Sequence, residues 1–200
     1  IKQFEKRENQ WFEKYINFQN IKKPFFYEKK IDIQKIENKI KFKISKNQNF
    51  IEYSEEAFRY LKDISQKIKV NKGGLLLIDY GYTDQKMKNT LQGVLNHKFA
   101  NILEHIFNVD ITHNINFNLY KNFIKKIAGL DNILTTQKYF LKNMGIMERA
   151  EIISKNQNFL KKADIYYRIK RLIDEKQMGE LFKVMLIKDK KNKFNLGFNS

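Results

Sequence analysis

The stretch Lys72-Gly73-Gly74-Leu75-Leu76-Leu77-Ile78-Asp79-Tyr80-Gly81 decides the fold. Its two glycines allow a sharp turn, such as the one that ends a helix. The apolar run that follows has no polar alternation, which is typical of a parallel strand buried on both faces. Because ligands bind at the carboxyl ends of such strands, we expect residues 79–82 to lie on a functional rim.

The segments around this strand predict an α/β layer. Ser54 is a good N-cap, and apolar residues recur at helical spacing from Ala57 to Ile68. Further along, the pattern predicts a helix over 119–127 ended by Gly129, a strand over 133–136, helices over 140–173 broken near Gly145, and a strand over 181–187. Helices that alternate with buried strands indicate an α/β fold.

The first 50 residues predict strands. Two extended pieces, 1–4 and 11–18, flank a charged turn, and weak alternation predicts an edge hairpin around 39–44, with three lysines facing water. The polar segment 83–108 predicts a long rim loop with a short helical piece, on whose surface we expect His105.

Composition excludes several classes of protein. The 200 residues contain no cysteine, which excludes disulfides, thiolate metal sites and cysteine nucleophiles. The longest apolar run is far shorter than the roughly 20 residues of a membrane span. The net charge of +17 comes from lysines spread along every segment, which predicts a solvated surface able to attract an acidic partner. Without an arginine-rich block, a nucleic-acid-binding domain is the weakest reading.

Several short motifs carry a resemblance to a known family. They are Ile51-Glu52-Tyr53-Ser54, Gly73 to Gly81, Asn89 to Phe99, Asp110-Ile111-Thr112, Phe140 to Ile146 and Met178 to Val184. In order and spacing, these motifs resemble the carboxyl half of the MidA family of S-adenosylmethionine-dependent methyltransferases. In mitochondria that family supplies assembly factors for respiratory complex I. The resemblance covers about residues 50–188.

The resemblance implies a class I, Rossmann-like methyltransferase sheet, carboxyl half, with an added β-hairpin and a helical insertion before the last strand. Residues 74–80, 133–136 and 181–187 would be its fifth, sixth and antiparallel seventh strands. It also implies that the S-adenosylmethionine loop lies upstream of residue 1, and the first residue is not Met. We therefore expect the carboxyl-terminal part of one domain, which folds poorly alone because its central strand keeps an uncovered edge.

Within that domain we expect these parts: a strand and hairpin region over 1–50, the core sheet and helices over 51–138, a helical insertion over 139–176, the last strand over 177–188 and a tail over 189–200.

The candidate site residues cluster near the rim. Asp79 is expected to hold a guanidinium by charge-assisted hydrogen bonds, and His97 to act as a general base, against structural roles as a turn cap and a hydrogen-bonded loop histidine. The remaining substrate-binding candidates are Tyr80, Gly81, Asp110, Thr112 and His113. We expect no cofactor-binding residue within the chain, and no metal site, because no ligands stand at a suitable spacing.

Three positions depart from the family pattern. Tyr82 stands where the family commonly has His, Asn116 stands where it usually has an acidic residue, and His113 precedes the family's His by one place. Because Asn116 has no carboxylate, we do not expect it to take the role of the family's acidic residue at this position.

The resemblance implies methylation of a protein arginine, with a respiratory complex I subunit or an equivalent protein as partner. The location would be the cytoplasm of a bacterium or the mitochondrial matrix of a eukaryote. The alternative is a non-catalytic assembly or binding protein that uses the same rim.

Overall fold

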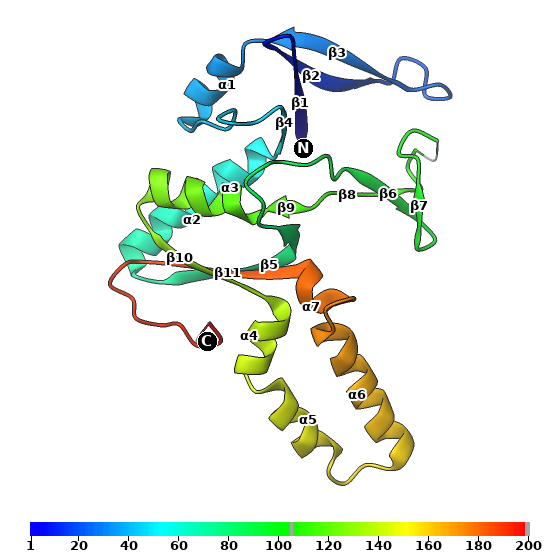
Figure 1. Ribbon diagram of the computed structural model, residues 1–200, viewed down its shortest axis with the longest axis vertical. Coiled ribbons are helices and arrows are strands. Elements are labelled where there is room, and N and C mark those ends of the chain that lie inside the picture. The colour runs from blue at the N-terminus through cyan, green and yellow to red at the C-terminus, as the bar shows by residue number, and fades with distance from the viewer. Residues whose placement is uncertain (105, 199–200) are drawn as a thin grey trace.

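The computed structural model describes residues 1–104 and 106–198. Figure 1 shows three sheets above a projecting group of helices. The strand orders are β3-β2-β1-β4, β10-β11-β5-β9 and β7-β6-β8. One buried apolar cluster joins the first sheet, the second sheet and the two helices between them.

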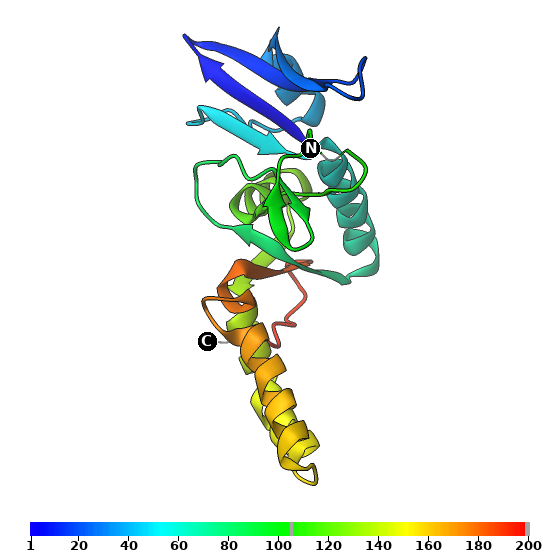
Figure 2. The ribbon, with the colours of Figure 1, turned by 90° about the vertical axis from the view of Figure 1, so that its right-hand side faces the viewer.

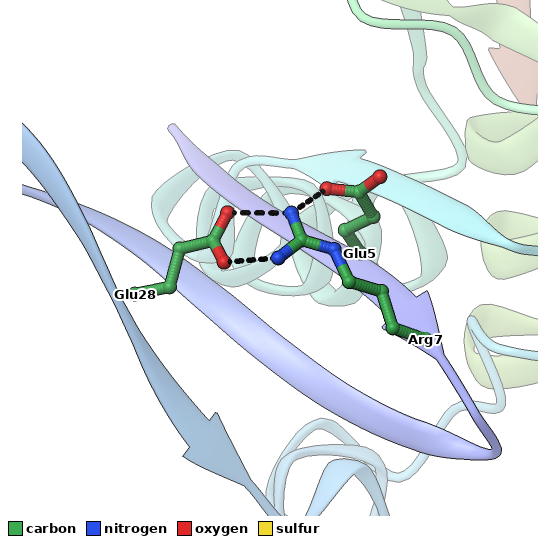
Figure 3. A network of polar contacts seen from close by, with 3 residues as sticks. All are labelled: Glu5, Arg7 and Glu28. Atoms are coloured by element: carbon green, nitrogen blue, oxygen red, sulfur yellow. Dashed lines mark hydrogen bonds and ion pairs between the residues drawn. The ribbon is translucent and has the colours of Figure 1, made fainter.

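The first sheet is antiparallel throughout. Its strands are β1 (Lys2–Arg7), β2 (Gln10–Asn17), β3 (Phe25–Ile31) and β4 (Phe50–Tyr53). The two extended pieces predicted at the start of the chain are confirmed as β1 and β2. On this sheet, Arg7 donates to both carboxylate oxygens of Glu28 at 2.7 and 2.9 Å and to Glu5 at 2.5 Å, which connects β1 to β3 (Figure 3).

The predicted edge hairpin around 39–44 is wrong. This region begins as helix α1 (Ile33–Ile40), which Asp32 caps by accepting from the backbone N–H of Gln34 at 2.9 Å. Isoleucines three and four residues apart form a helical face, which outweighed the weak alternation. Phe42 and Ile44 follow in an irregular segment and are 7% and 2% exposed, so they fill the core without pairing in a ladder.

Helix α2 (Glu55–Asn71) confirms the predicted N-cap. The Ser54 hydroxyl accepts from the backbone N–H of Ala57 at 3.2 Å. The left-handed residue that ends α2 is Lys72, with φ 55°, and not one of the two glycines that we expected to make this turn. Phe58 of α2 stacks on Phe123, with ring centroids 4.2 Å apart, at the centre of the core.

The second sheet has the strand order of a class I methyltransferase. Strand β11 (Phe182–Lys188) lies between β5 (Gly74–Tyr82) and β10 (Asp131–Thr136) and is antiparallel to both. The short strand β9 (Ile115–Asn116) pairs in parallel with the last two residues of β5. The antiparallel last strand that the resemblance implied is therefore confirmed.

Burial of β5 on both faces, which the apolar run predicted, is wrong for this chain. Leu75 and Leu77 pack against the core, whereas Leu76 and Ile78 on the other face are 44% and 47% exposed. Within the described residues, the edge of β5 opposite β11 is paired only at Gly81 and Tyr82. This open edge and bare face match the uncovered surface expected from the sequence.

A third sheet replaces the predicted long loop. It consists of β6 (Gln92–Leu95), β7 (Lys98–Ala100) and β8 (Asp110–Thr112), and the central strand β6 is antiparallel to both β7 and β8. Gly93 allows this close pairing, because a Cβ there would lie 2.7 Å from the carbonyl oxygen of Ala100. No helix occurs in the described part of 83–108, and His105 lies outside the described residues.

The remaining helices follow the predicted breaks. Helix α3 (Phe117–Phe123) continues as a π-helical turn (Ile124–Ala128) and ends at left-handed Gly129. Between β10 and β11 lie α4 (Gln137–Asn143), α5 (Ile146–Ser154), α6 (Phe159–Ile173) and α7 (Met178–Leu181), with the break at Gly145 (φ 80°). Figure 2 shows α5 and α6 projecting away from the sheets. None of the described helices combines the length and apolar character that a membrane crossing requires.

Candidate functional site

The carboxyl end of β5 presents Asp79 and Tyr80 on opposite faces, because side chains alternate along a strand. Asp79 shares the core-facing side with Leu75 and Leu77, and its Oδ1 accepts from the backbone N–H of Tyr80 at 2.8 Å. On the bare face, the Tyr80 ring packs edge-on against Phe182, with centroids 5.6 Å apart. The two predicted site residues are therefore adjacent in sequence but do not share one surface.

Asp79 approaches a buried phenol on α3. Burial raises the pKa of Tyr120 to about 12, and the negative charge of Asp79 adds to this shift. Apart from the bond to the backbone of Tyr80, no hydrogen bond or ion pair of Asp79 occurs among the described residues. The other carboxylate oxygen of Asp79 is thus without a hydrogen-bond partner among the described residues.

Gly81 serves the packing of the chain itself. A Cβ at this position would collide with the carbonyl oxygen of Ile115 and lie 2.8 Å from the ring of Phe117. Only glycine permits β9 and α3 to approach β5 this closely. Gly81 is a candidate for contact with a substrate, but β9 and α3 fill the space next to its Cα.

His97 lies in the turn between β6 and β7. Asn96 and His97 both have positive φ, 51° and 62°, as in the two-residue turns that suit hairpins. The side chain is exposed, and within the described residues it makes no hydrogen bond to Asp79. The structure does not join these two predicted catalytic residues in one constellation.

The other three candidates lie on or next to β8. Asp110 is exposed and pairs with Val94 of β6 in the sheet register. By contrast, the Thr112 hydroxyl and the His113 Nδ1 are buried and lack a hydrogen-bond partner among the described residues. Buried polar atoms are nearly always paired, so these two atoms are the best local candidates for contact with a ligand.

Sequence reasoning missed a buried polar network behind the rim. The carboxylate of Glu52, 5% exposed, accepts from Gln3 at 2.6 Å and from the backbone N–H of Thr90 at 3.2 Å, and it also bonds the Thr90 hydroxyl. The same hydroxyl accepts from the backbone N–H of Asn114 at 2.9 Å. Glu52 therefore fastens the rim loop and the residues after β8 to β4. The sequence signal that could have revealed this network is Glu52 itself, a carboxylate between Ile51 and Tyr53 in an otherwise apolar strand.

Two of the three departures from the family pattern, Tyr82 and Asn116, make structural hydrogen bonds. The Tyr82 hydroxyl accepts from the backbone N–H of Lys88 at 3.0 Å, and burial raises its pKa. Asn116 caps α3 by accepting from the backbone N–H of Leu119 at 2.9 Å, and its amide donates to the carbonyl of Asp84 at 3.2 Å. Both residues shape the loop that follows β5.

The glycines at the rim do not leave open space for S-adenosylmethionine beside them. The sequence contains no G-x-G-x-G, and a Cβ at either Gly81 or Gly93 would meet the chain's own backbone, so neither glycine frames an open ligand site. Within the described part of the chain, no three His, Asp or Glu side chains gather as metal ligands.

The strand order of the second sheet is consistent with a Rossmann-like methyltransferase fold. Solved structures agree with this fold. A superfamily member from Burkholderia thailandensis, crystallised with S-adenosyl-homocysteine, matches all of this chain with 51% of its own length, a TM-score of 0.73 and 21% identity. A second crystal structure from the same organism matches 99% of this chain with 52% of its own length and a TM-score of 0.70, also at 21% identity.

The family model described as "Putative S-adenosyl-L-methionine-dependent methyltransferase" matches residues 1–136, and the chain belongs to this family. The similar curated relatives include the mitochondrial protein arginine methyltransferase NDUFAF7 of zebrafish, 29% identical over 136 residues, and of human, 29% identical over 134 residues. Each match covers 66% of this chain but only 31% and 30% of the relative. The chain thus spans about a third of the length of these relatives.

Proposed function

We propose that the protein carrying this chain is a methyltransferase that transfers a methyl group from S-adenosylmethionine to an arginine side chain of a protein substrate. The chain would form the carboxyl-terminal part of a single domain. Its parts would be those predicted from the sequence, from the strand and hairpin region over 1–50 to the tail over 189–200. The observation that carries the proposal is the β10-β11-β5 order with its antiparallel last strand, which places Asp79 at a carboxyl rim. The printed names of the relatives support arginine as the acceptor.

In this proposal the chain's own residues position the acceptor. S-adenosylmethionine would supply an electrophilic methyl group. Asp79 would hold the guanidinium through its available carboxylate oxygen, and the unpaired Thr112 hydroxyl and His113 Nδ1 would offer further polar contacts. Catalysis would then rest mainly on orientation and on exclusion of water from the reacting atoms.

The first experiment is calorimetric titration of the full-length protein with S-adenosylmethionine, followed by transfer of a labelled methyl group and mass spectrometry of the modified residue. We expect binding and a modified arginine. Asp79→Asn should reduce transfer about 10- to 100-fold, because a hydrogen bond to a charged group contributes about 1.5–3 kcal/mol. The exposed Asp110→Asn is the control, with a smaller expected change.

An alternative to the enzyme is a binding protein without catalytic activity. A non-catalytic assembly protein could use the same rim to recognise its partner. Failure of the full-length protein to bind S-adenosylmethionine would overturn the enzymatic proposal and favour this alternative.

The proposed partner is a protein substrate, such as a respiratory complex subunit. The proposed location is the bacterial cytoplasm or the mitochondrial matrix, and the relatives named above are mitochondrial. Fractionation of the source cells, followed by detection of the protein with an antibody, tests the location.

A further inference from the structure

A polar hollow of about 780 Å³ lies next to the loop that follows β5. Its walls come from the segment 42–49, the segment 85–87, β1 and α3, which are far apart in the sequence. Lys6, Lys43, Lys46 and Lys86 line it together with asparagine and glutamine side chains. No aspartate or glutamate is among the described residues that line it.

Hydrogen bonds between the two loops fix the walls of this lysine hollow. The side chain of Gln48 accepts from the backbone N–H of Met87 at 2.9 Å and donates to the carbonyl of Gln85 at 2.8 Å. Lys86 donates to the carbonyl of Asn47, and Asn116 ties the loop to α3 through the carbonyl of Asp84. The hollow is therefore formed before any ligand arrives, which lowers the cost of binding.

Three lysines of the lysine hollow have no ion pair among the described residues, although the buried carboxylate of Glu37 accepts from Ser45 of the same wall at 2.8 Å. Lys6, Lys43 and Lys46 make no ion pair with any described residue, although lysines elsewhere, such as Lys39 and Lys88, pair with carboxylates. Like charges that converge on a concave surface raise the local potential and attract anions. This arrangement distinguishes the hollow from the evenly spread lysines of the remaining surface.

We propose that the lysine hollow binds an acidic segment of a protein partner. The ammonium groups suit aspartate and glutamate side chains, and the surrounding amide side chains can both donate to and accept from a peptide backbone. The one ring in the lining, Phe42, is 7% exposed, so the lining offers no aromatic face on which a nucleic-acid base could stack. The volume lies within the range of ligand pockets and exceeds that of a single phosphate.

The test measures the anisotropy of a fluorescein-labelled oligoglutamate peptide titrated with the full-length protein at fixed ionic strength. Lys6, Lys43 and Lys46 are changed together to Gln. The matched control changes Lys155, directly after α5, and Lys161 and Lys162 on α6 to Gln, which removes the same charge from the projecting helices (Figure 1). We expect about tenfold weaker binding for the first variant and less than about twofold for the control.

Equal weakening by both triple variants would overturn the proposal, because binding would then follow net charge alone. A second variant, Asn118→Asp, keeps the side-chain oxygen that accepts from the amide of Asn122 at 3.4 Å and places a carboxylate among the lining residues. It should weaken peptide binding several-fold while circular dichroism shows an unchanged fold, and unchanged binding would count against the hollow.

Two competitors separate the possible sources of the anion. Sodium tripolyphosphate or a short RNA that displaces the peptide at lower concentration than unlabelled oligoglutamate would overturn the assignment to a protein segment. The measurement contains no S-adenosylmethionine, so its outcome is independent of whether the protein transfers methyl groups.

Discussion

The body of the protein and its helical arm, α5 and α6, differ in what their helices pack against. In the body, α2 and α3 lie against strands, and Phe58, Phe123 and Ile124 are at most 3% exposed. In the arm, the buried residues are Ala150, Ser154 and Ile169, whereas Phe159 and Leu160 are 82% and 77% exposed. An amphipathic pattern predicts a helix in both regions, but only the body supplies a second layer to cover it.

This difference predicts where a substitution acts on the whole fold. A residue in the body should change the global free energy of unfolding, while a residue in the arm should change local opening. We expect the loss of global stability to be largest for a core ring of the body, smaller for a buried tyrosine and a helix cap, and smallest for an exposed ion pair.

Phe58→Ala should lower the free energy of unfolding by about 3–5 kcal/mol, because it leaves a cavity against Phe123 and Phe42. Phe159→Ala on the arm should change it by less than about 0.5 kcal/mol. Urea denaturation of the full-length variants measures both. Similar losses for the two variants would show that the arm is covered as well as the body.

High pH should destabilise the body through Tyr120. Its folded pKa is raised from 10.0 to about 12, so the stabilising contribution is present below pH 10 and is lost as the pH rises towards 12. The loss is about 2–3 kcal/mol, since one pKa unit corresponds to about 1.4 kcal/mol. Unfolding followed against pH checks this, and Tyr120→Phe should flatten the profile in that window.

The two helix caps should separate global from local stability. Ser54→Ala removes the cap of α2 and should lower the global free energy of unfolding by about 1 kcal/mol. Asn158 caps α6 by accepting from the backbone N–H of Lys161 at 3.0 Å. Asn158→Ala should mainly speed amide exchange in the first turn of α6, and hydrogen exchange with mass spectrometry measures the difference.

The smallest effects belong to ion pairs. Lys39 is the main cause of the lowered pKa of Glu55, with Lys2 contributing less. Lys39→Gln should raise the pKa of Glu55. At a pH above the usual pKa of Glu, the variant should lose about 0.3–0.5 kcal/mol of the free energy of unfolding. Wild type loses the same contribution as the pH falls through the lowered pKa of Glu55. Asp164→Asn, which breaks the 2.9 Å pair with Arg168 on the arm, should cost a similar amount locally. NMR titration of the Glu55 carboxyl tests the first variant.

Much of the fold could be predicted where the cause is local. Ser54, Gly129 and Gly145 mark helix boundaries by their own hydrogen bonding or backbone freedom, and the structure confirms all three. The resemblance added the antiparallel last strand and the family. By contrast, α1 was mistaken for strand, and the third sheet for a loop, because short segments carry too little periodicity to separate the two.

The candidate site could be predicted only in part. Asp79 and Tyr80 were expected at the end of the strand and lie there, but alternation sends their side chains to opposite faces. The position of His97 in a hairpin turn depends on β6 and β7, which the sequence did not reveal. The roles of all seven candidates stay predictions.

The sequence by itself determined the helix caps, the apolar strand at 75–78 and the family, because these depend on neighbouring residues and on motif order. Only the tertiary structure decided which face of β5 is exposed and which carboxylate holds the rim loop. It also decided which lysines line one hollow without an ion pair among the described residues. Each of these depends on segments distant in the chain. Burial and electrostatic potential arise from what lies nearby in space, and a linear pattern does not record that.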